Sequence, residues 1–386
     1  MKNKSLEAQE DLTLSIEYKK PSRFWRVILI LFFLFLVITG INTFIVYRRA
    51  KKYQEQFLRG AEISQEDLLN TIESFRQDSA HLLENQDQAI KKKTLLILGA
   101  DQLAGRDDGA ILTDTMILLQ LDLQNNQIKT IALPRDIYHS AYQTRINALY
   151  YYGLEDNPDE PLDFPARAIS ELTGIDIDHT LLIEIDALEE LIDLVGGVEI
   201  TIEEGFTDPL FPRKNVDVSI ETDPAILYES IVFEEGQEKM DGNRAMQYMR
   251  SRNSGDDQGN DLARGHRQQV VLQALLKQIL NLDFLLNEPE KFGQLYRFYL
   301  NHFAQSLSVN EVGRIATSWL IIHNEDEEIA APKFISFAIP VYPENADGLI
   351  YNPPLWQTQR QWIYQIRDLE IFKKTLQDFL ANNELN

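Results

Sequence analysis

Two aspartates in this sequence are placed to bind a divalent metal ion. Asp101 comes just after the apolar run Leu95–Leu98, and Asp114 comes just before the apolar run Met116–Leu121. If these runs are neighbouring antiparallel strands, both carboxylates lie at one edge of a sheet. Hard carboxylate oxygens suit Mg²⁺ (or Mn²⁺), which often binds one or two of them together with substrate phosphate oxygens. The alternative is that each aspartate only caps a turn or a helix.

Arginines at the ends of predicted elements could bind an anion. Arg135 and Asp136 follow a proline that ends the apolar run Ile128–Leu133. Arg250 and Arg252 are two residues apart, so in an extended segment both side chains point to the same side. Taken singly, such residues are also common at protein surfaces, where an ion pair contributes little.

A third group lies at the start of the strongest predicted helix, Leu262–Leu280. Asp261, Arg264 and Gln268 are spaced i, i+3 and i+7, so they share one stripe of this helix. Polar groups in the first turns of a helix are near the positive end of its dipole, where anions bind. A solvated helix start is the alternative on spacing alone.

The composition limits what this protein can bind. With 37 basic and 60 acidic residues, the formal net charge is −23, which argues against a general nucleic-acid binder. Several arginines that converge in such a chain need an anionic partner. Arginine suits phosphate because its planar fork donates two parallel hydrogen bonds and stays charged. Such a clamp with Mg²⁺ is suited to displacement at phosphorus.

Other reaction classes lack their usual residues. The chain has no cysteine, which excludes disulfides, thiolate nucleophiles and Cys-type metal sites. The G-x-S-x-G, H-E-x-x-H and G-x-x-x-x-G-K-[ST] motifs are also absent from the sequence.

These residues must be positioned by a domain in which strands and helices alternate. We predict an α/β fold, a single domain with a mixed central sheet that is covered by helices on both faces. The polar turn Gln124–Asn126 predicts a hairpin, and a long loop is predicted around Pro209, Pro212 and Pro224. The predicted strands are Leu95–Leu98, Met116–Leu121, Ile128–Leu133, Thr180–Ile185, Val198–Ile202, Ile231–Phe233 and Phe334–Ile339. The predicted helices are Asn147–Tyr152, Ala166–Leu172, Ala187–Leu194, Gly242–Tyr248, Leu262–Leu280 and Ile366–Leu380.

A membrane anchor is predicted near the amino terminus. Val27–Tyr47 is a run of 21 residues without charge, which is about 30 Å long as a helix. Basic residues flank it on both sides, so charge does not decide its orientation. The predicted organisation is a tail over 1–26, a transmembrane helix over 27–47, a helical stalk over 48–93, a catalytic domain over 94–285 and a helical extension over 286–386.

Two stretches of the domain resemble the LytR-CpsA-Psr family. The first contains LLILGADQLAGRDDGAILTDTMILLQLDLQNNQIKTIALPRDIYHS, followed by TRINALYYYG, and the second is DGNRAMQYMRSRNSGDDQGNDLARGHRQQVVLQALL. The shared motifs are G-x-D, D-T-M, P-R-D, R-I-N, R-S-R and D-x-x-R with R-Q-Q, in this order. The resemblance covers about Thr94 to Leu280. Ser254–Gly259 looks like a small extension, and nothing beyond about Leu280 matches the family pattern.

The resemblance implies a phosphotransferase that moves a glycopolymer, such as teichoic acid or capsular polysaccharide, from undecaprenyl pyrophosphate to peptidoglycan. It implies a cytoplasmic tail, one membrane helix and an extracytoplasmic catalytic domain, with no nucleic-acid partner. By motif, Asp101 and Asp114 would hold the metal, and Asp261 would orient the helix arginine. The residues implied to bind the pyrophosphate are Arg135, Arg250, Arg252, Asp261, Arg264 and Gln268, and those implied in catalysis are Arg135, Asp136, Arg250 and Arg252.

Several alternatives stay open at this point. The general base that takes the proton of the acceptor hydroxyl is undecided between Asp101 and Asp136. The resemblance also implies that the prenyl tail of the donor lies in an apolar tunnel beside the sheet. A non-catalytic polyprenyl-phosphate carrier or sensor would keep the arginines but could lose the carboxylates, and the presence of Asp101 and Asp114 favours catalysis. A pyrophosphatase acting on such lipids and a structural wall-attachment protein are the other readings.

Overall fold

The computed structural model describes residues 46–100, 111–214, 216, 221–281, 286–323, 331–343 and 345–382. The chain divides into two compact units, Met1–Glu55 and Gln56–Asn386. Of the predicted membrane segment only Val46 and Tyr47 are described, and both are helical. None of the helices among the described residues combines the length and the hydrophobicity that a bilayer-spanning segment requires. Asp101 lies outside the described residues, and the side chain of Asp261 is likewise not described.

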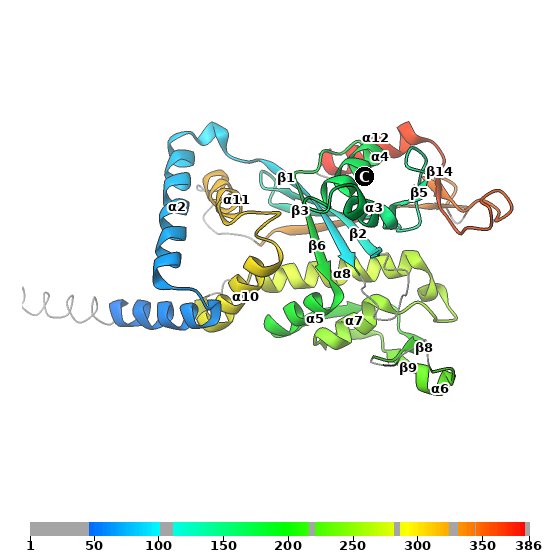
Figure 1. Cartoon of the computed structure of the whole chain (residues 1–386), viewed down its shortest axis with the longest axis horizontal. Coiled ribbons are helices and arrows are strands. Elements are labelled where there is room, and N and C mark those ends of the chain that lie inside the picture. Colours follow the sequence, from blue (N-terminus) through cyan, green and yellow to red (C-terminus); the bar gives the residue numbers. More distant parts are fainter. Residues whose placement is uncertain are drawn as a thin grey trace, which may run out of the picture. The chain divides into compact units, whose positions relative to one another are not determined.

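A five-stranded mixed sheet forms the centre of the second unit, in the order β11-β3-β2-β1-β6 (Figure 1). β2 pairs antiparallel with both β1 and β3, whereas the outer strands β6 and β11 are parallel to β1 and β3, respectively. The predicted mixed sheet is therefore confirmed. Its strands are β1 Lys92–Ala100, β2 Thr113–Asp122, β3 Gln127–Ala132, β6 His179–Glu184 and β11 Lys333–Ala338.

The predicted hairpin between β2 and β3 is also confirmed. Asp122 ends β2, and its carboxylate accepts a hydrogen bond from the backbone N–H of Asn125 at 3.1 Å. Asn126 follows with φ 49°, a left-handed conformation that asparagine tolerates better than most residues. The buried carboxylate of Asp122 is also paired with Lys92 at 2.9 Å. This turn fixes the register of the two strands that carry most of the candidate site.

Helices cover both faces of the sheet because its strands alternate their apolar side chains. Leu96 and Leu98 of β1 belong to a core on one face, whereas Leu95 packs with Leu272 and Leu276 on the other. The first face is covered by α3, α4 and α12, and the second by α8. These helices are α3 Leu149–Asp156, α4 Asp163–Thr173, α8 Asp261–Ile279 and α12 Leu369–Ala381.

Helix α8 also borders a second core on its far side. Val271 and Leu275 of α8 pack there with side chains of α5, α7 and the small β7–β10 sheet. Figure 1 shows α5 and α7 on the side of α8 that faces away from the central sheet. α8 is therefore held between two apolar layers along its middle, and Leu262 in its first turn packs against the core on the opposite face of the sheet. The elements of this layer are α5 Ile185–Leu194, β7 Val198–Ile202, β10 Gly236–Met240 and α7 Gly242–Arg250.

The prediction of an irregular loop around Pro209 and Pro212 is wrong for residues 206–212. These residues form β8, Phe206–Pro212, which pairs antiparallel with β9, Tyr228–Phe233. The register shifts between Asp208 and Phe211, so Pro209 lies in a bulge. Proline lacks a backbone N–H, and a bulge in a two-stranded pair does not require one at that position.

The segments on either side of residues 94–285, the predicted catalytic domain, contribute to the same compact unit. Residues beyond 285 supply β11 to the central sheet and α12 to its cover. Within the predicted stalk, α2 packs along α11, where Ser74 Oγ donates to Asn310 Oδ1 at 3.1 Å. The helices of these segments, besides α12, are α2 Gln65–Glu84, α10 Pro289–His302 and α11 Val309–Ile322.

The remaining elements are short. They are β4 Tyr138–His139, β5 Thr144–Arg145, α6 Pro224–Leu227, β12 Val341–Tyr342, β13 Ile350–Tyr351 and β14 Gln365–Ile366, with 3₁₀ turns at Gln86–Gln88, Ile146–Ala148 and Asp257–Gly259.

Candidate functional site

A pocket lies at one edge of the central sheet, between the ends of three strands and the first turns of α8. It is formed where β2 begins and where β3 and β11 end. The empty space between its lining atoms, with the open solvent at its mouth included, is about 470 Å³. It is lined by Asp114, Met116, Ala132, Leu133, Pro134, Arg135, Leu262, Arg264, Gly265, His266, Gln268, Gln269, Ala338 and Ile339.

A β-bulge directs Asp114 at this edge. Gly99 pairs with Thr115 and Ala100 pairs with Thr113, so Asp114 is the extra residue of β2. A bulge bends the strand and re-aims the side chain of the extra residue. Asp101 is outside the described residues, and Ala100, directly before it in the chain, is the partner of Thr113. The two strands that precede Asp101 and follow Asp114 are antiparallel neighbours, which is the condition under which both carboxylates were expected at one edge.

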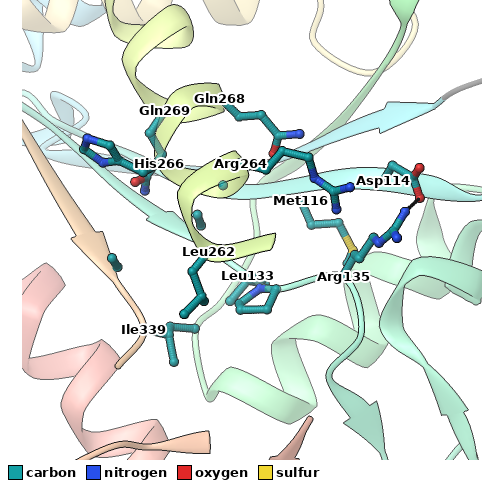
Figure 2. A pocket seen from close by; sticks show the side chains of 14 residues that line it. Asp114, Met116, Leu133, Arg135, Leu262, Arg264, His266, Gln268, Gln269 and Ile339 are labelled. Atoms are coloured by element: carbon teal, nitrogen blue, oxygen red, sulfur yellow. Dashed lines mark ion pairs between the residues drawn. The ribbon is translucent and has the colours of Figure 1, made fainter. Parts of the chain in front are cut away.

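Arg135 faces Asp114 across the pocket entrance. Its Nη1 forms an ion pair with Asp114 Oδ1 at 2.8 Å, and both side chains are partly buried. Pro134 closes β3 and turns the chain away from the ladder, so Arg135 leaves the sheet at its edge. A charge-assisted contact of this length fixes both groups. Figure 2 shows the ion pair, with the Met116 side chain beside it.

Asp136 contacts the Arg135 guanidinium through its carboxylate. Its buried carboxylate accepts a hydrogen bond from Arg145 Nη1 at 3.0 Å, and its Oδ2 lies 3.4 Å from Arg135 Nε. With one oxygen toward each guanidinium, this carboxylate is placed to orient Arg135. Sequence reasoning gave Arg145 no role, although it is the arginine of the R-I-N motif. The assignment of Asp136 as a possible general base stays a prediction.

The first turns of α8 add Arg264 and Gln268 from above. Both side chains are buried, with relative exposures of 7% and 8%. Figure 2 shows the Arg264 side chain extended toward Arg135 and Asp114, with Gln268 beside it. The helix start is fixed by its N-cap, where Asn260 Oδ1 accepts from the N–H of Ala263 at 2.8 Å. The i, i+4 spacing thus places both groups on the stripe that faces the pocket.

Four predicted residues thus line one pocket, whereas Asp136, Arg250 and Arg252 are not among its lining residues. Arg250 is the last residue of α7, and the exposed Arg252 lies two positions further along the chain. Asp208, which is fully buried, holds this segment by accepting hydrogen bonds from the N–H groups of Arg252 at 3.0 Å and Asn253 at 3.2 Å. The roles of Arg250 and Arg252 stay predictions.

Sequence reasoning also missed Arg267, which holds the same segment from the side of α8. Its side chain is 1% exposed and donates to the carbonyl oxygens of Tyr248 at 2.9 Å, Gln258 at 3.0 Å and Ser251. The guanidinium lies over the Phe206 ring, 4.8 Å from its centroid. Burial lowers its pKa to about 10. The R-Q-Q motif was the available signal, because Arg267 is its first residue.

The pocket residues suit a divalent metal in their chemistry. Asp114 presents a carboxylate at the opening, and one of its oxygens is engaged by Arg135. Mg²⁺ commonly binds to one or two carboxylates and completes its octahedron with water and phosphate oxygens. Within the described part of the chain, no group of three or more histidine, aspartate or glutamate side chains is arranged around a common point. Asp114 is therefore the described residue that fits as a ligand.

Curated proteins similar to this chain carry names of wall-polymer transferases or regulators. The polyisoprenyl-teichoic acid–peptidoglycan teichoic acid transferase TagU of Oceanobacillus iheyensis is 24% identical over 63% of this chain and 67% of its own length. TagV of Bacillus subtilis, with the same descriptive name, is 23% identical over 66% of this chain and 57% of its own length. The regulatory protein MsrR of Staphylococcus aureus is 28% identical over 54% of this chain and 56% of its length. The chain thus spans between about half and two thirds of these relatives.

Two solved structures show the same fold. The crystal structure of B. subtilis TagV aligns with 76% of this chain and 99% of that chain, with a TM-score of 0.50 and 19% identity. Protein gbs0355 of Streptococcus agalactiae aligns with 79% of this chain and 92% of that chain, with a TM-score of 0.52 and 18% identity. The sequence model of the LytR_cpsA_psr family matches residues 51–313, more than half of the chain. With its motifs placed on the strand ends and on the first turns of α8, this chain belongs to the LytR-CpsA-Psr family.

Proposed function

We propose that this protein transfers a glycopolymer from a polyprenyl pyrophosphate carrier, such as undecaprenyl pyrophosphate, to peptidoglycan. The observation that carries the proposal is the convergence of Arg135 and Arg264 with Asp114 and Gln268 in one pocket. A chain of net charge −23 gathers two arginines there, and paired guanidiniums are the groups best suited to a diphosphate. The transferase names of TagU and TagV support the same reaction class.

The pocket is amphiphilic, as a prenyl pyrophosphate is. Figure 2 shows Arg135 and Asp114 at one side and the apolar side chains of Leu262, Leu133 and Ile339 at the other. The diphosphate would bind on the charged side. The first isoprene units would continue over the apolar side chains, where their burial is favourable. This arrangement supports a lipid-linked donor more than a soluble nucleotide.

In the proposed reaction a sugar hydroxyl of peptidoglycan attacks the phosphorus that carries the polymer. A new oxygen–phosphorus bond forms, the bond to the lipid-side phosphate breaks, and undecaprenyl phosphate leaves. Arg135 and Arg264 would stabilise the negative charge on the phosphate oxygens. Gln268 would donate an amide hydrogen bond to the same group, and Asp136 would keep Arg135 oriented. Asp101 and Asp136 are the candidates that would take the proton.

Mg²⁺ or Mn²⁺ would be held by Asp114, and by Asp101 by resemblance. When bound, the ion would neutralise diphosphate oxygens and make the lipid phosphate a better leaving group. We further propose that residues 27–47 anchor the chain in the cell membrane, with the amino terminus in the cytoplasm. The catalytic domain would then meet its lipid donor and the wall outside the membrane.

The reaction can be tested with the full chain in nanodiscs. The donor would be a labelled oligosaccharide on polyprenyl pyrophosphate, and the acceptor would be peptidoglycan oligomers. Arg264→Met should lower transfer by about 100- to 1000-fold, which is typical when a donor to a charged transition state is lost. The matched control is Arg314→Met, an exposed helical arginine paired with Glu311 at 3.6 Å, and it should stay within about twofold of the wild type.

The products distinguish the alternatives. Transfer yields labelled peptidoglycan and polyprenyl phosphate, and chelation with EDTA should abolish it. Release of free polymer phosphate at an equal rate with or without acceptor would identify a pyrophosphatase instead. Tight donor binding without any turnover would identify a carrier or sensor. Wild-type transfer rates in Arg264→Met would remove the pocket from the mechanism.

A further inference from the structure

A loop near the carboxyl terminus presents large apolar side chains to solvent. It comprises residues 352–363, which connect β13 to β14, and we call it the aromatic loop. Trp356 is 79% exposed, Trp362 51% and Leu355 47%. Tryptophan is usually buried because its ring removes a large apolar area from water. Two tryptophans and one leucine exposed on one short loop are typical of a binding surface.

The loop is held in one conformation by its own polar groups. Thr358, which is buried, donates through Oγ1 to the carbonyl of Gln361 at 2.6 Å, and Asn352 Nδ2 donates to the carbonyl of Ile363 at 2.7 Å. The N–H of Arg360 donates to the Leu355 carbonyl at 2.7 Å. These contacts close the loop on itself while its tryptophans point outward. A ligand would therefore meet a preformed surface at a small entropic cost.

The base of the loop is joined to the segment that carries Arg135. Tyr364 directly follows the loop, and its N–H donates to the carbonyl of Asp136 at 2.8 Å. The carbonyl of Tyr364 in turn accepts from the N–H of Tyr138 at 2.8 Å. The loop is thus fixed by backbone hydrogen bonds to the residues next to Arg135. A ligand on the aromatic loop would be held near the edge of the sheet where the pocket lies.

The chemistry of the loop indicates a neutral, hydroxyl-rich ligand. Although the chain has 60 acidic residues, none occurs within the loop, and Arg360 is its single charged residue. Exposed amides alternate along it, from Gln357, Gln359 and Gln361. A flat indole packs against the C–H face of a pyranose ring, and amides both donate to and accept from hydroxyl and acetamido groups. An anionic membrane surface or a nucleic acid would call for several cations instead.

We infer that the aromatic loop binds the glycan strand of peptidoglycan, a chain of N-acetylated sugars, and holds it as the acceptor beside the Arg135 pocket. The acceptor role rests on the proposed transfer reaction. The binding itself does not, because it depends on Trp356, Trp362 and the neighbouring amides alone. Residues 352–363 lie outside the segment matched by the family model, which ends at residue 313.

Binding can be measured with the full chain in nanodiscs and with peptidoglycan stripped of attached polymers. Cosedimentation gives the affinity, and soluble N-acetylglucosamine oligomers can be titrated by tryptophan fluorescence. The double variant Trp356→Ala and Trp362→Ala should bind at least tenfold more weakly. Val312→Ala combined with Leu320→Ala removes two apolar side chains that are similarly exposed on α11, and it should bind as the wild type does. Trp356→Phe, which keeps an aromatic face, should retain most of the affinity.

Two results would overturn the inference. One is unchanged peptidoglycan binding by the double tryptophan variant. The other is strong quenching of the loop tryptophans by brominated lipids in the nanodisc, which would assign the loop to the membrane. Arg264→Met should still bind peptidoglycan while transfer is lost, and the loop variant should raise KM for the acceptor with little change in kcat. Failure of transfer in the wild type would thus refute the proposed function and leave the binding result to be judged separately.

Discussion

Replacing Arg267 by methionine tests how the segment that carries Arg250 and Arg252 is held in place. The guanidinium is buried and donates to the carbonyls of Tyr248, Ser251 and Gln258. Methionine keeps much of the length and the apolar stem but has no donor. The variant therefore leaves three carbonyl oxygens without this partner while the packing against Phe206 is largely kept.

The expected loss of stability is the difference of two terms. Leaving a buried carbonyl without a donor costs roughly 2 kcal/mol, so three of them cost about 6 kcal/mol. Against this, the buried charge disappears. Burial lowers the pKa of Arg267 to about 10, and at about 1.4 kcal/mol per pKa unit this is a penalty of about 3 kcal/mol. Because the folded pKa is the lower one, the penalty is fully present at neutral pH and is relieved only above about pH 10. The net expectation is a loss of about 3 kcal/mol.

Two measurements on the full chain check this reasoning. Urea unfolding gives the change in the free energy of unfolding, and hydrogen exchange follows the N–H groups of Arg252 and Asn253, which are bonded to Asp208. Their exchange should become at least tenfold faster in Arg267→Met. Arg264→Met, one turn earlier on α8, should impair transfer without loosening this segment. Unaltered exchange at both amides, together with a stability change below about 0.5 kcal/mol, would refute a positioning role for Arg267.

Two further predictions concern buried polar groups near the site. Asp136→Asn removes the charge that faces Arg135 and Arg145. Because Arg145 is partly exposed, we expect the free energy of unfolding in urea to fall by about 2 kcal/mol, which is below the usual range for a buried pair. A change within about 0.5 kcal/mol would contradict this expectation. Burial lowers the pKa of His139, whose Nε2 lies 3.0 Å from the Ala168 carbonyl. The unfolded chain therefore binds the proton more readily, and stability falls as the pH drops below about 6.5. His139→Gln should flatten this dependence, and an unchanged slope would assign it to another group.

Much of the fold followed from periodicity along the chain. The apolar runs that predicted strands occur as β1, β2, β3, β6, β7, β9 and β11, and the polar turn before Gln127 closes the predicted hairpin. The amphipathic pattern of α8 placed it within one residue at each end. The strand β8 was missed because Pro209 is a strong local signal for a loop. Its pairing with β9 depends on residues about twenty positions away, which local patterns do not report.

The candidate site divides in a similar way. Motif and spacing singled out Asp114, Arg135, Arg264 and Gln268, and all four line one pocket. The R-Q-Q motif contains Arg267 but does not show its role, because its main partners are backbone carbonyls of segments that only the folded chain brings to it. Nor did the sequence place Arg250 outside the pocket lining, since that depends on how α7 packs against α8.

The residue types and their local spacing were thus determined by the sequence itself: the strands, the helix stripe and the phosphate-directed chemistry of the arginines. Only the tertiary structure decided which of these residues share one edge of the sheet. A bulge of a single residue re-aims Asp114, and apolar cores on both sides of α8 hold this helix in place. Both effects arise from contacts between segments that are distant in sequence. Such contacts depend on the summed packing of the whole domain, which no local pattern contains.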